Sequence, residues 1–227
     1  MKAVVLLSGG LDSIVNFKCA LDEGEILKAL TCNYGQVAFE GEARAASECA
    51  RRYGVMHEIV DLGFFRRLVN NPIAGDGKLK PVSHADIRAG RRSMLEETWV
   101  PNRNALLVAV GAAFAESLGA GEVVAGFNLE EAGLYPDNSA EFVRRMNAAL
   151  EISTLSGVRV KSYTLELNKK ETVALGIENG APLEVVYSCY EAPHEGRMCG
   201  VCQSCMRLKA SFDANGVLDR YLGRFAA

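Results

Sequence analysis

Residues 3–13 read AVVLLSGGLDS, an apolar run followed by a glycine pair and the start of a helical pattern. An uninterrupted apolar run indicates a strand that is buried on both faces. Beyond the glycines, Ile14, Phe17 and Leu21 recur at helical spacing until Gly24. The stretch therefore predicts a strand, a tight loop and a helix, and such a helix N-terminus favours an anion.

The loop at 8–13 has the composition of a phosphate-binding loop. Two adjacent glycines let the backbone approach phosphate oxygens closely, so we expect a valine at Gly9 to occupy the space of an oxygen and leave the fold intact. The two serines add hydroxyl donors, and Asp12 can cap the helix or hold Mg²⁺. A plain connection capped by Asp12 is the alternative, but it does not explain the doubled glycine. We assign ATP binding to Leu7, Ser8, Gly9, Gly10, Leu11, Asp12 and Ser13.

The order of residues in this loop narrows the class of enzyme. The chain has neither the G-x-x-x-x-G-K-[ST] nor the G-x-G-x-x-G pattern, which argues against a Walker loop and a dinucleotide fold. S-G-G-x-D-S resembles the PP-loop of adenylating synthetases, which hold the pyrophosphate of ATP while AMP is transferred to an oxygen. We therefore count Asp12 among the catalytic candidates.

The rest of the chain alternates strands and helices. We expect strands at 26–31, 56–61, 122–126 and 159–165, and helices at 40–53, 104–118, 139–152 and 170–178. Such alternation predicts an α/β fold with a doubly wound parallel sheet, of the Rossmann-like PP-loop type. We predict an ATP-binding α/β domain over 1–180 and a small C-terminal zinc-binding segment packed on it over 181–227.

Seven cysteines fall into two groups. Three lie far apart in apolar contexts and are expected in the core: Cys19, Cys32 and Cys49. Four lie close together and suit a closed, structural Zn²⁺ site: Cys189, Cys199, Cys202 and Cys205. The odd total and the lack of a secretion signal argue against a disulfide framework. His194 in place of one ligand, or an iron–sulfur cluster, stays open at this point.

Composition excludes several other classes of protein. With 227 residues, 49% of them hydrophobic and 23% charged, the chain is typical of a globular protein. The net charge of −3 argues against non-specific nucleic-acid or anionic-membrane binding. No apolar run could span a bilayer, and residues 1–7 fit a strand better than a signal peptide. We expect a cytoplasmic protein without nucleic-acid or membrane partners, for which a homodimer is one allowed state.

One polar segment does not fit the alternation. Residues 70–102 are rich in glycine and proline and carry several basic residues. At the carboxyl edge of a parallel sheet such a segment would form an active-site lid. A surface insertion is the alternative reading of the same composition.

A series of motifs along nearly the whole chain resembles the 7-cyano-7-deazaguanine synthase family of queuosine biosynthesis. The motifs are Ser8–Ser13, Asn33–Gln36, Trp99–Asn104, Gly126–Asn128, Tyr135–Ser139, Ser188–Tyr190 and Cys199–Cys205. The resemblance implies conversion of 7-carboxy-7-deazaguanine, ammonia and ATP into the nitrile, with Mg²⁺ at the phosphates and the four cysteines on zinc. No glutaminase is visible, so ammonia is expected to come free or from a partner protein.

The resemblance also suggests roles for individual side chains. Arg103 is a catalytic candidate that could contact phosphate or the substrate carboxylate bidentately, and a solvated surface arginine is the alternative. Lys169, in the family's late Lys-x-Glu pattern, is a candidate for charge neutralisation, or simply a lysine that starts a helix. For the substrate we assign Tyr34, Gln36, Arg103, Tyr135 and Asp137. Tyr135 or Phe127 could stack on the purine-like ring, or pack in the core.

Three stretches depart from the family's pattern around the expected substrate pocket. Val37 and Ala38 stand where basic residues often follow Tyr-Gly-Gln, residues 131–134 replace an Asp-x-Ser-Gly, and residues 162–164 replace a Thr-Pro-Leu. The ATP loop and the cysteine cluster keep the pattern.

Two other kinds of protein remain as alternatives. One is another PP-loop enzyme, a transfer-RNA thiolation or lysidine synthetase or a modifier of proteins; thiolation would need a reactive cysteine near the loop, which only Cys32 offers. The other is a zinc-stabilised RNA-binding module without catalysis. It would need a basic face and stacking aromatics, which the net charge of −3 and 7% aromatic residues do not favour.

Overall fold

The computed structural model describes residues 1–68, 73, 98–191, 193 and 195–227. Within these residues the centre is a parallel sheet with the strand order β3-β2-β1-β4-β5. Its strands are β1 (Lys2–Leu6), β2 (Glu25–Asn33), β3 (His57–Asp61), β4 (Glu122–Val124) and β5 (Arg159–Lys161). The predicted α/β fold with a doubly wound parallel sheet is confirmed.

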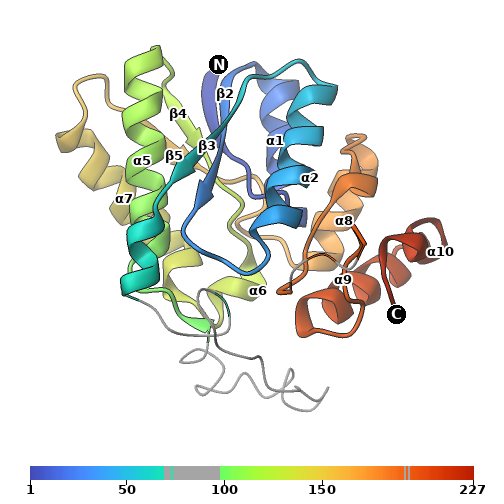
Figure 1. Cartoon of the computed structure of the whole chain (residues 1–227). Coiled ribbons are helices and arrows are strands. Elements are labelled where there is room, and N and C mark those ends of the chain that lie inside the picture. The colour runs from blue at the N-terminus through green and yellow to red at the C-terminus, as the bar shows by residue number, and fades with distance from the viewer. Residues whose placement is uncertain (69–72, 74–97, 192, 194) are drawn as a thin grey trace.

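Helices cover both faces of the sheet (Figure 1). On one face lie α1 (Leu11–Glu23), α2 (Phe39–Arg52) and α8 (Lys169–Glu178), and on the other lie α5 (Arg103–Leu118) and α7 (Ala140–Ser153). Side chains of β1 alternate between these layers: Ala3 and Val5 join the first, and Val4 joins the second. This double burial explains why the first strand is an unbroken apolar run.

The site lies where the order of the strands reverses. β1 pairs with β2 on one side and with β4 on the other, so the loops after β1 and β4 open a crevice at the carboxyl edge. Gly126 follows β4, and a Cβ on it would lie 2.7 Å from the backbone nitrogen of Ser13. A glycine is therefore required for the first turn of α1 to approach the end of β4 this closely.

Two strands are shorter than predicted. β4 ends at Val124 and β5 at Lys161, although the strands were expected to continue to residues 126 and 165. After Lys161 the chain bonds to neighbouring loops through side chains: the hydroxyls of Ser162 and Thr164 both donate to the carbonyl of Phe127, at 2.9 and 2.7 Å. Hydrogen bonds of this kind replace the strand ladder, which hydrophobicity alone does not reveal.

Several short elements complete the described chain. They are α6 (Leu129–Ala132), α9 (Gln203–Asp213), α10 (Leu218–Tyr221) and the 3₁₀ turns η1 (Gly63–Arg67), η2 (Pro136–Asn138), η3 (Leu183–Val185) and η4 (Leu222–Arg224). Most of the segment 70–102, the predicted lid or insertion, lies outside the described residues, and so does His194. Among the helices that are described, none combines the length and the apolar character that crossing a bilayer would need.

The C-terminal residues pack against the sheet's helices. Figure 1 shows α9 and α10 beside α8, at one edge of the molecule. Tyr187 and Phe212 belong to the same buried cluster as Leu7 and Ala46. The ring of Tyr187 lies so close to α2 that a Cβ on Gly41 would be 2.4 Å from ring carbons. The division at residue 180 stays a prediction.

We predict that Gly41→Ala destabilises the protein because the added methyl overlaps the buried ring of Tyr187. Overpacking of a core costs roughly 1–3 kcal/mol, and the gain in helix propensity returns about 0.5–1 kcal/mol of it. The free energy of unfolding, measured with urea, should therefore fall by about 1–2 kcal/mol. The control is Gly121→Ala, where nothing lies within 4 Å of the added Cβ. Equal stability of the two variants would show that Tyr187 does not pack on α2.

Candidate active site

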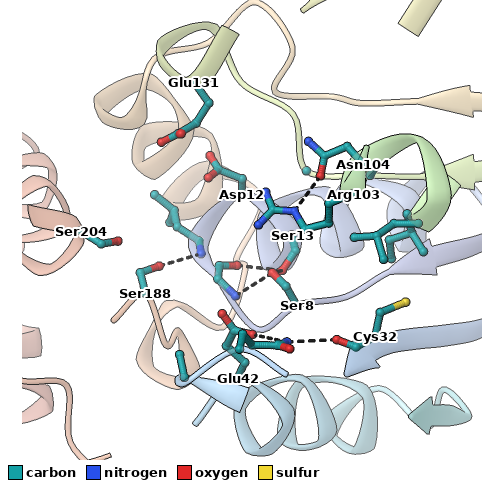
Figure 2. Close-up of a pocket in the computed structure, with 18 of the residues that line it drawn as sticks. Ser8, Asp12, Ser13, Cys32, Glu42, Arg103, Asn104, Glu131, Ser188 and Ser204 are labelled. Atoms are coloured by element: carbon teal, nitrogen blue, oxygen red, sulfur yellow. Dashed lines mark hydrogen bonds between the residues drawn. The ribbon is translucent and has the colours of Figure 1, made fainter. Parts of the chain in front are cut away.

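A pocket of about 300 Å³ opens at the carboxyl edge of the sheet. Its wall is formed by the loop after β1, the ends of β2 and β4, the first residues of α5 and α8, and residues 187–190. Figure 2 shows Ser8, Asp12, Arg103, Glu42 and Glu131 arranged around it. The loop predicted to bind ATP, called the ATP loop below, and most of the predicted substrate residues thus meet in one place.

The loop at 8–13 is ordered by its own serines. The hydroxyl of Ser8 donates to Ser13 Oγ at 3.1 Å, and the hydroxyl of Ser13 donates to the carbonyl of Gly10 at 2.9 Å. Gly10 is the N-cap of α1 and has no side chain to bond the first turn, so Asp12 does not cap the helix as one interpretation predicted. No side chain caps the N–H groups of Asp12 and Ser13, so these two groups can bond a bound anion.

Gly9 has a packing role that the sequence did not predict. Its φ is +82°, and a Cβ on it would lie 2.4 Å from the carbonyl oxygen of Glu42 and 2.9 Å from Ala45 Cβ. The residue is a glycine because α2 packs against the loop there. The expectation that a valine would meet only a phosphate oxygen and leave the fold intact is wrong.

Residues 187–188 hold the loop from its other side. The backbone N–H of Tyr187 donates to the carbonyl of Gly9 at 2.9 Å, and the backbone N–H of Leu11 donates to Ser188 Oγ at 3.2 Å. Ser188 directly precedes Cys189 in the sequence. The cysteine-rich segment therefore forms part of the wall around the loop.

A chain of ion pairs crosses the pocket floor. Lys169 Nζ lies 3.2 Å from Asp12 Oδ2 and 3.8 Å from Glu131 Oε1, and Arg207 Nη1 lies 3.3 Å from the same Glu131 oxygen. Burial lowers the pKa of Lys169, but the charges of Asp12 and Glu131 outweigh it and raise the pKa, so the amine is protonated. Among the described residues Asp12 Oδ1 is buried without a hydrogen-bond partner. Such an oxygen is suited to a divalent cation.

Arg103 opens α5 and points into the pocket. Its Nη1 donates to the hydroxyl of Tyr34 at 3.2 Å, and its guanidinium lies 5.4 Å from the centre of that ring. Burial lowers the pKa of Arg103, but Tyr34 and Asp137 more than compensate for it. The predicted alternative of a solvated surface arginine does not describe this enclosed side chain.

Next to Arg103 an amide organises the end of β2. Gln36 Nε2 donates to the carbonyl of Cys32 at 3.0 Å and to Glu42 Oε2 at 2.9 Å, while its Oε1 accepts the backbone N–H of Tyr34 at 3.0 Å. Burial raises the pKa of Cys32 to about 11, so this cysteine stays a thiol. A buried thiol of this kind does not fit the reactive cysteine that thiolation would need.

The other aromatic candidates occupy different surroundings. Tyr135 lines the pocket, bonds to Thr98 Oγ1 at 2.6 Å and stacks on Trp99 with ring centres 6.5 Å apart. Phe127 is 5% exposed and packs edge-on against Phe142, so most of its ring belongs to the core. Asp137 does not line the pocket, and its role as a substrate ligand stays a prediction.

The four C-terminal cysteines converge. Their sulfur atoms all lie within 4.8 Å of one another, with 4.0 Å between Cys189 and Cys202 and 3.8 Å between Cys199 and Cys205. A tetrahedral Zn²⁺ with Zn–S bonds of about 2.3 Å has sulfur separations of about 3.8 Å. Disulfide sulfurs would lie about 2.05 Å apart. The donor set and its spacing are consistent with zinc.

Backbone N–H groups support these sulfurs. Cys199 Sγ accepts from the N–H of Cys202 at 3.3 Å, and Cys202, the N-cap of α9, accepts from Cys205 at 3.5 Å. Hydrogen bonds to sulfur stabilise the thiolate that a metal requires. The three remaining cysteines were expected in the core, where Cys32 and Cys49 are buried and Cys19 is partly buried.

Sequence reasoning missed several residues of the pocket. They are Glu42, Glu131, Ser188, Tyr190 and Ser204. The sequence does contain one signal for Glu42. The residue lies three positions before Ala45 and four before Ala46, which places it on the buried face of α2. A carboxylate on an apolar stripe is unusual unless it has a function. The pocket contacts of Glu131 and Ser204 depend on tertiary structure.

Comparison with known proteins identifies the family. The family described as queuosine biosynthesis protein QueC matches residues 2–216. The chain belongs to this family. Its QueC relatives include the 7-cyano-7-deazaguanine synthases of Carboxydothermus hydrogenoformans, 41% identical over 94% of this chain and 99% of the relative, and of Desulforudis audaxviator, 44% identical over 96% and 99%.

A solved structure was also compared with the chain. The NMN synthetase of Francisella tularensis is similar with a TM-score of 0.47 and 17% identity, over 96% of this chain and 81% of its own. The strand order described above, rather than this likeness, establishes the fold. The predictions of the QueC family and of an ATP-dependent ligase are confirmed by the family match and the curated relatives.

We predict that Asp12→Asn lowers ATP turnover by about 10²–10³-fold, because it removes a charge that both pairs with Lys169 and is suited to a cation. The fold should persist, since asparagine keeps the shape of the side chain. AMP formation and the circular dichroism spectrum are the measurements. Asp22→Asn, which removes a surface carboxylate paired with Lys18 on the same helix, is the control. Normal turnover by Asp12→Asn would remove Asp12 from the site.

Proposed function

We propose that this pocket converts 7-carboxy-7-deazaguanine, ammonia and ATP into 7-cyano-7-deazaguanine for queuosine biosynthesis. The observation that carries the proposal is the union, in one pocket, of the S-G-G-L-D-S loop with Arg103 and Lys169 in a chain of this family. The loop supplies anion binding, and the two cations neutralise the charge of the phosphates and of a carboxylate. The substrate and ATP are thereby held together.

ATP is the first ligand in the proposal. The N–H groups of the first turn of α1 and the hydroxyls of Ser8 and Ser13 would hold the pyrophosphate, which leaves as AMP is transferred. Lys169 pairs with Asp12 of this loop, so its amine lies close enough to neutralise the charge of the pyrophosphate. Asp12 Oδ1 would hold the Mg²⁺ that accompanies ATP, and this ion neutralises the phosphates.

The second ligand is the carboxylate. Arg103 has a planar guanidinium that suits bidentate contact with a carboxylate. The hydroxyl of Tyr34 accepts a hydrogen bond from Arg103 Nη1 at 3.2 Å and so fixes the orientation of the guanidinium. Tyr135 offers a ring beside Trp99 for stacking on the purine-like base. Gln36 keeps the end of β2 in the conformation that places Tyr34.

The chemistry requires two activations. A nitrile carbon retains neither carboxylate oxygen, and neither oxide nor hydroxide leaves readily. Transfer of AMP to one oxygen of the acid, attack by ammonia, and transfer of AMP to the oxygen of the amide would remove both oxygens as part of AMP. The amide is therefore an intermediate in this proposal, and the same loop serves both transfers.

Zinc has a structural part in the proposal. Cys189, Cys199, Cys202 and Cys205 would hold one Zn²⁺ per chain, and a closed set of thiolates leaves no position for substrate. The metal would fix residues 187–190, which contact the ATP loop. We also propose a cytoplasmic enzyme that takes ammonia, free or from a partner protein, and acts on no nucleic acid; a homodimer stays a prediction.

The function is tested by stoichiometry. Purified protein with 7-carboxy-7-deazaguanine, ammonium and MgATP should give the nitrile by mass spectrometry, with two AMP per nitrile. Synthetic amide without ammonium should give nitrile with one AMP. ADP as the main nucleotide would overturn transfer of AMP, and an amide that does not react would overturn the order of steps. Absence of product together with turnover on transfer RNA would favour another PP-loop enzyme.

The zinc site is tested through Cys202→Ser, which removes a ligand that is also the N-cap of α9. We expect zinc content to fall from about one per chain, together with the melting temperature, because metal binding is coupled to folding. Cys19→Ser, which changes a cysteine outside the cluster, should keep the metal. The measurements are elemental analysis and thermal unfolding. Full zinc content in the Cys202 variant would show that zinc binds elsewhere.

A further inference from the structure

The proposed reaction has a requirement that the phosphate loop does not meet. The nitrogen of a nitrile carries no proton, whereas ammonium, the form that dominates near neutral pH, is fully protonated. An ammonium ion that binds in the pocket must therefore lose all its protons there, and each proton must pass to a base. The oxygens of the substrate leave on AMP, so they cannot serve as the final acceptor.

Most acids of the pocket are already committed to cations. Asp12 lies 3.2 Å from Lys169, and Glu131 lies 3.3 Å from Arg207 and 3.8 Å from Lys169. The oxygens of these carboxylates already face cations, so an approaching ammonium ion would meet positive charge there. These two residues are suited to electrostatic roles.

Glu42 is different. Its side chain lines the same pocket, and among the described residues it takes part in no ion pair. The amide of Gln36 donates to Oε2 at 2.9 Å, while no hydrogen bond from the described chain reaches Oε1. Glu42 lies on α2, and this helix is fixed against the ATP loop because the backbone carbonyl of Glu42 packs on Gly9. Figure 2 shows Glu42 among the residues that line the pocket.

On the basis of the function proposed above, we propose that Glu42 is a further catalytic residue that accepts the protons lost by ammonium. In the first half, an N–H bond of ammonium breaks and an O–H bond forms on Glu42, and the freed ammonia attacks the carbon of the acyl adenylate. The adduct loses a second proton to Glu42 as AMP leaves. In the second half, the two amide protons depart by the same route while the second AMP leaves, and Glu42 returns each proton to water.

The surroundings of Glu42 match this task. Burial raises the pKa of Glu42 to about 7, against the opposing effects of the hydrogen bond from Gln36 and the charge of Arg103. The groups that face it are Arg103 from α5, the phenol of Tyr34 after β2 and the amide of Gln36. A base is most effective when its pKa is close to the working pH. Because the ionised form is the active one, the rate should rise as pH increases through about 7.

The test separates activation from amide formation. Glu42→Gln keeps the size of the side chain and the contact with Gln36, and Glu40→Gln, on an exposed position of α2, is the control. Exchange of labelled pyrophosphate into ATP, driven by 7-carboxy-7-deazaguanine without ammonium, should be close to wild type in both. Turnover with ammonium should fall about 10²–10⁴-fold in Glu42→Gln alone. Hydroxylamine, which is unprotonated at neutral pH, should restore single-turnover hydroxamate formation.

The pH profile gives a second measurement. At constant ammonium, wild type should show a rise that levels off above about pH 7, whereas the residual rate of Glu42→Gln should follow free ammonia and rise without levelling off there; Glu42→Asp should keep part of the rate and of the wild-type profile. If Glu42→Gln loses pyrophosphate exchange, or loses ammonium and hydroxylamine turnover equally, Glu42 binds or positions ligands and the inference is wrong. If wild type shows no exchange, the proposed function itself fails, and the inference fails with it.

Discussion

The arrangement of the site depends on one close approach, that of the first turn of α1 to the end of β4. Gly126 has no side chain, and an added Cβ would lie 2.7 Å from the nitrogen of Ser13. The approach brings the loop after β1 against the loop after β4, which leads to α6 and Glu131. Through Lys169, Glu131 and Asp12 then share one cation. A larger residue at 126 would separate the parts of the pocket before any ligand binds.

The second constraint on the site is the enclosure of the ATP loop by its neighbours. α2 and residues 187–188 enclose the ATP loop, one through the packing on Gly9 and the other through hydrogen bonds to Gly9 and Leu11. A loop that binds phosphate must present its N–H groups without spending binding energy on rearrangement. In this protein α2 and residues 187–188, which are far apart in sequence, hold the ATP loop in an ordered conformation. Glycine contributes close packing at this position, in addition to any contact with phosphate.

The sequence predicted features that are local and missed those that require tertiary contacts. The ATP loop and the cysteines were visible because their residues are neighbours in the chain and their spacing has a chemical reason. The sheet followed from the apolar runs, but the ends of β4 and β5 were wrong because the hydroxyls of Ser162 and Thr164 replace the ladder there. Glu131 and Arg207 act through contacts with residues distant in sequence, which no periodicity encodes.

The proximity of the cysteine cluster to the ATP loop has a thermodynamic consequence. Ser188 accepts the N–H of Leu11, and the next residue, Cys189, belongs to the cluster. A metal on these thiolates and a nucleotide on the loop would then favour the same conformation of residues 187–190. Coupling between two sites is reciprocal, so whatever the metal adds to nucleotide affinity, the nucleotide adds to metal affinity. At equilibrium a chelator should therefore extract less of the metal from a chain that is saturated with ATP, and metal retention would report on occupancy of a site to which none of the four cysteines belongs.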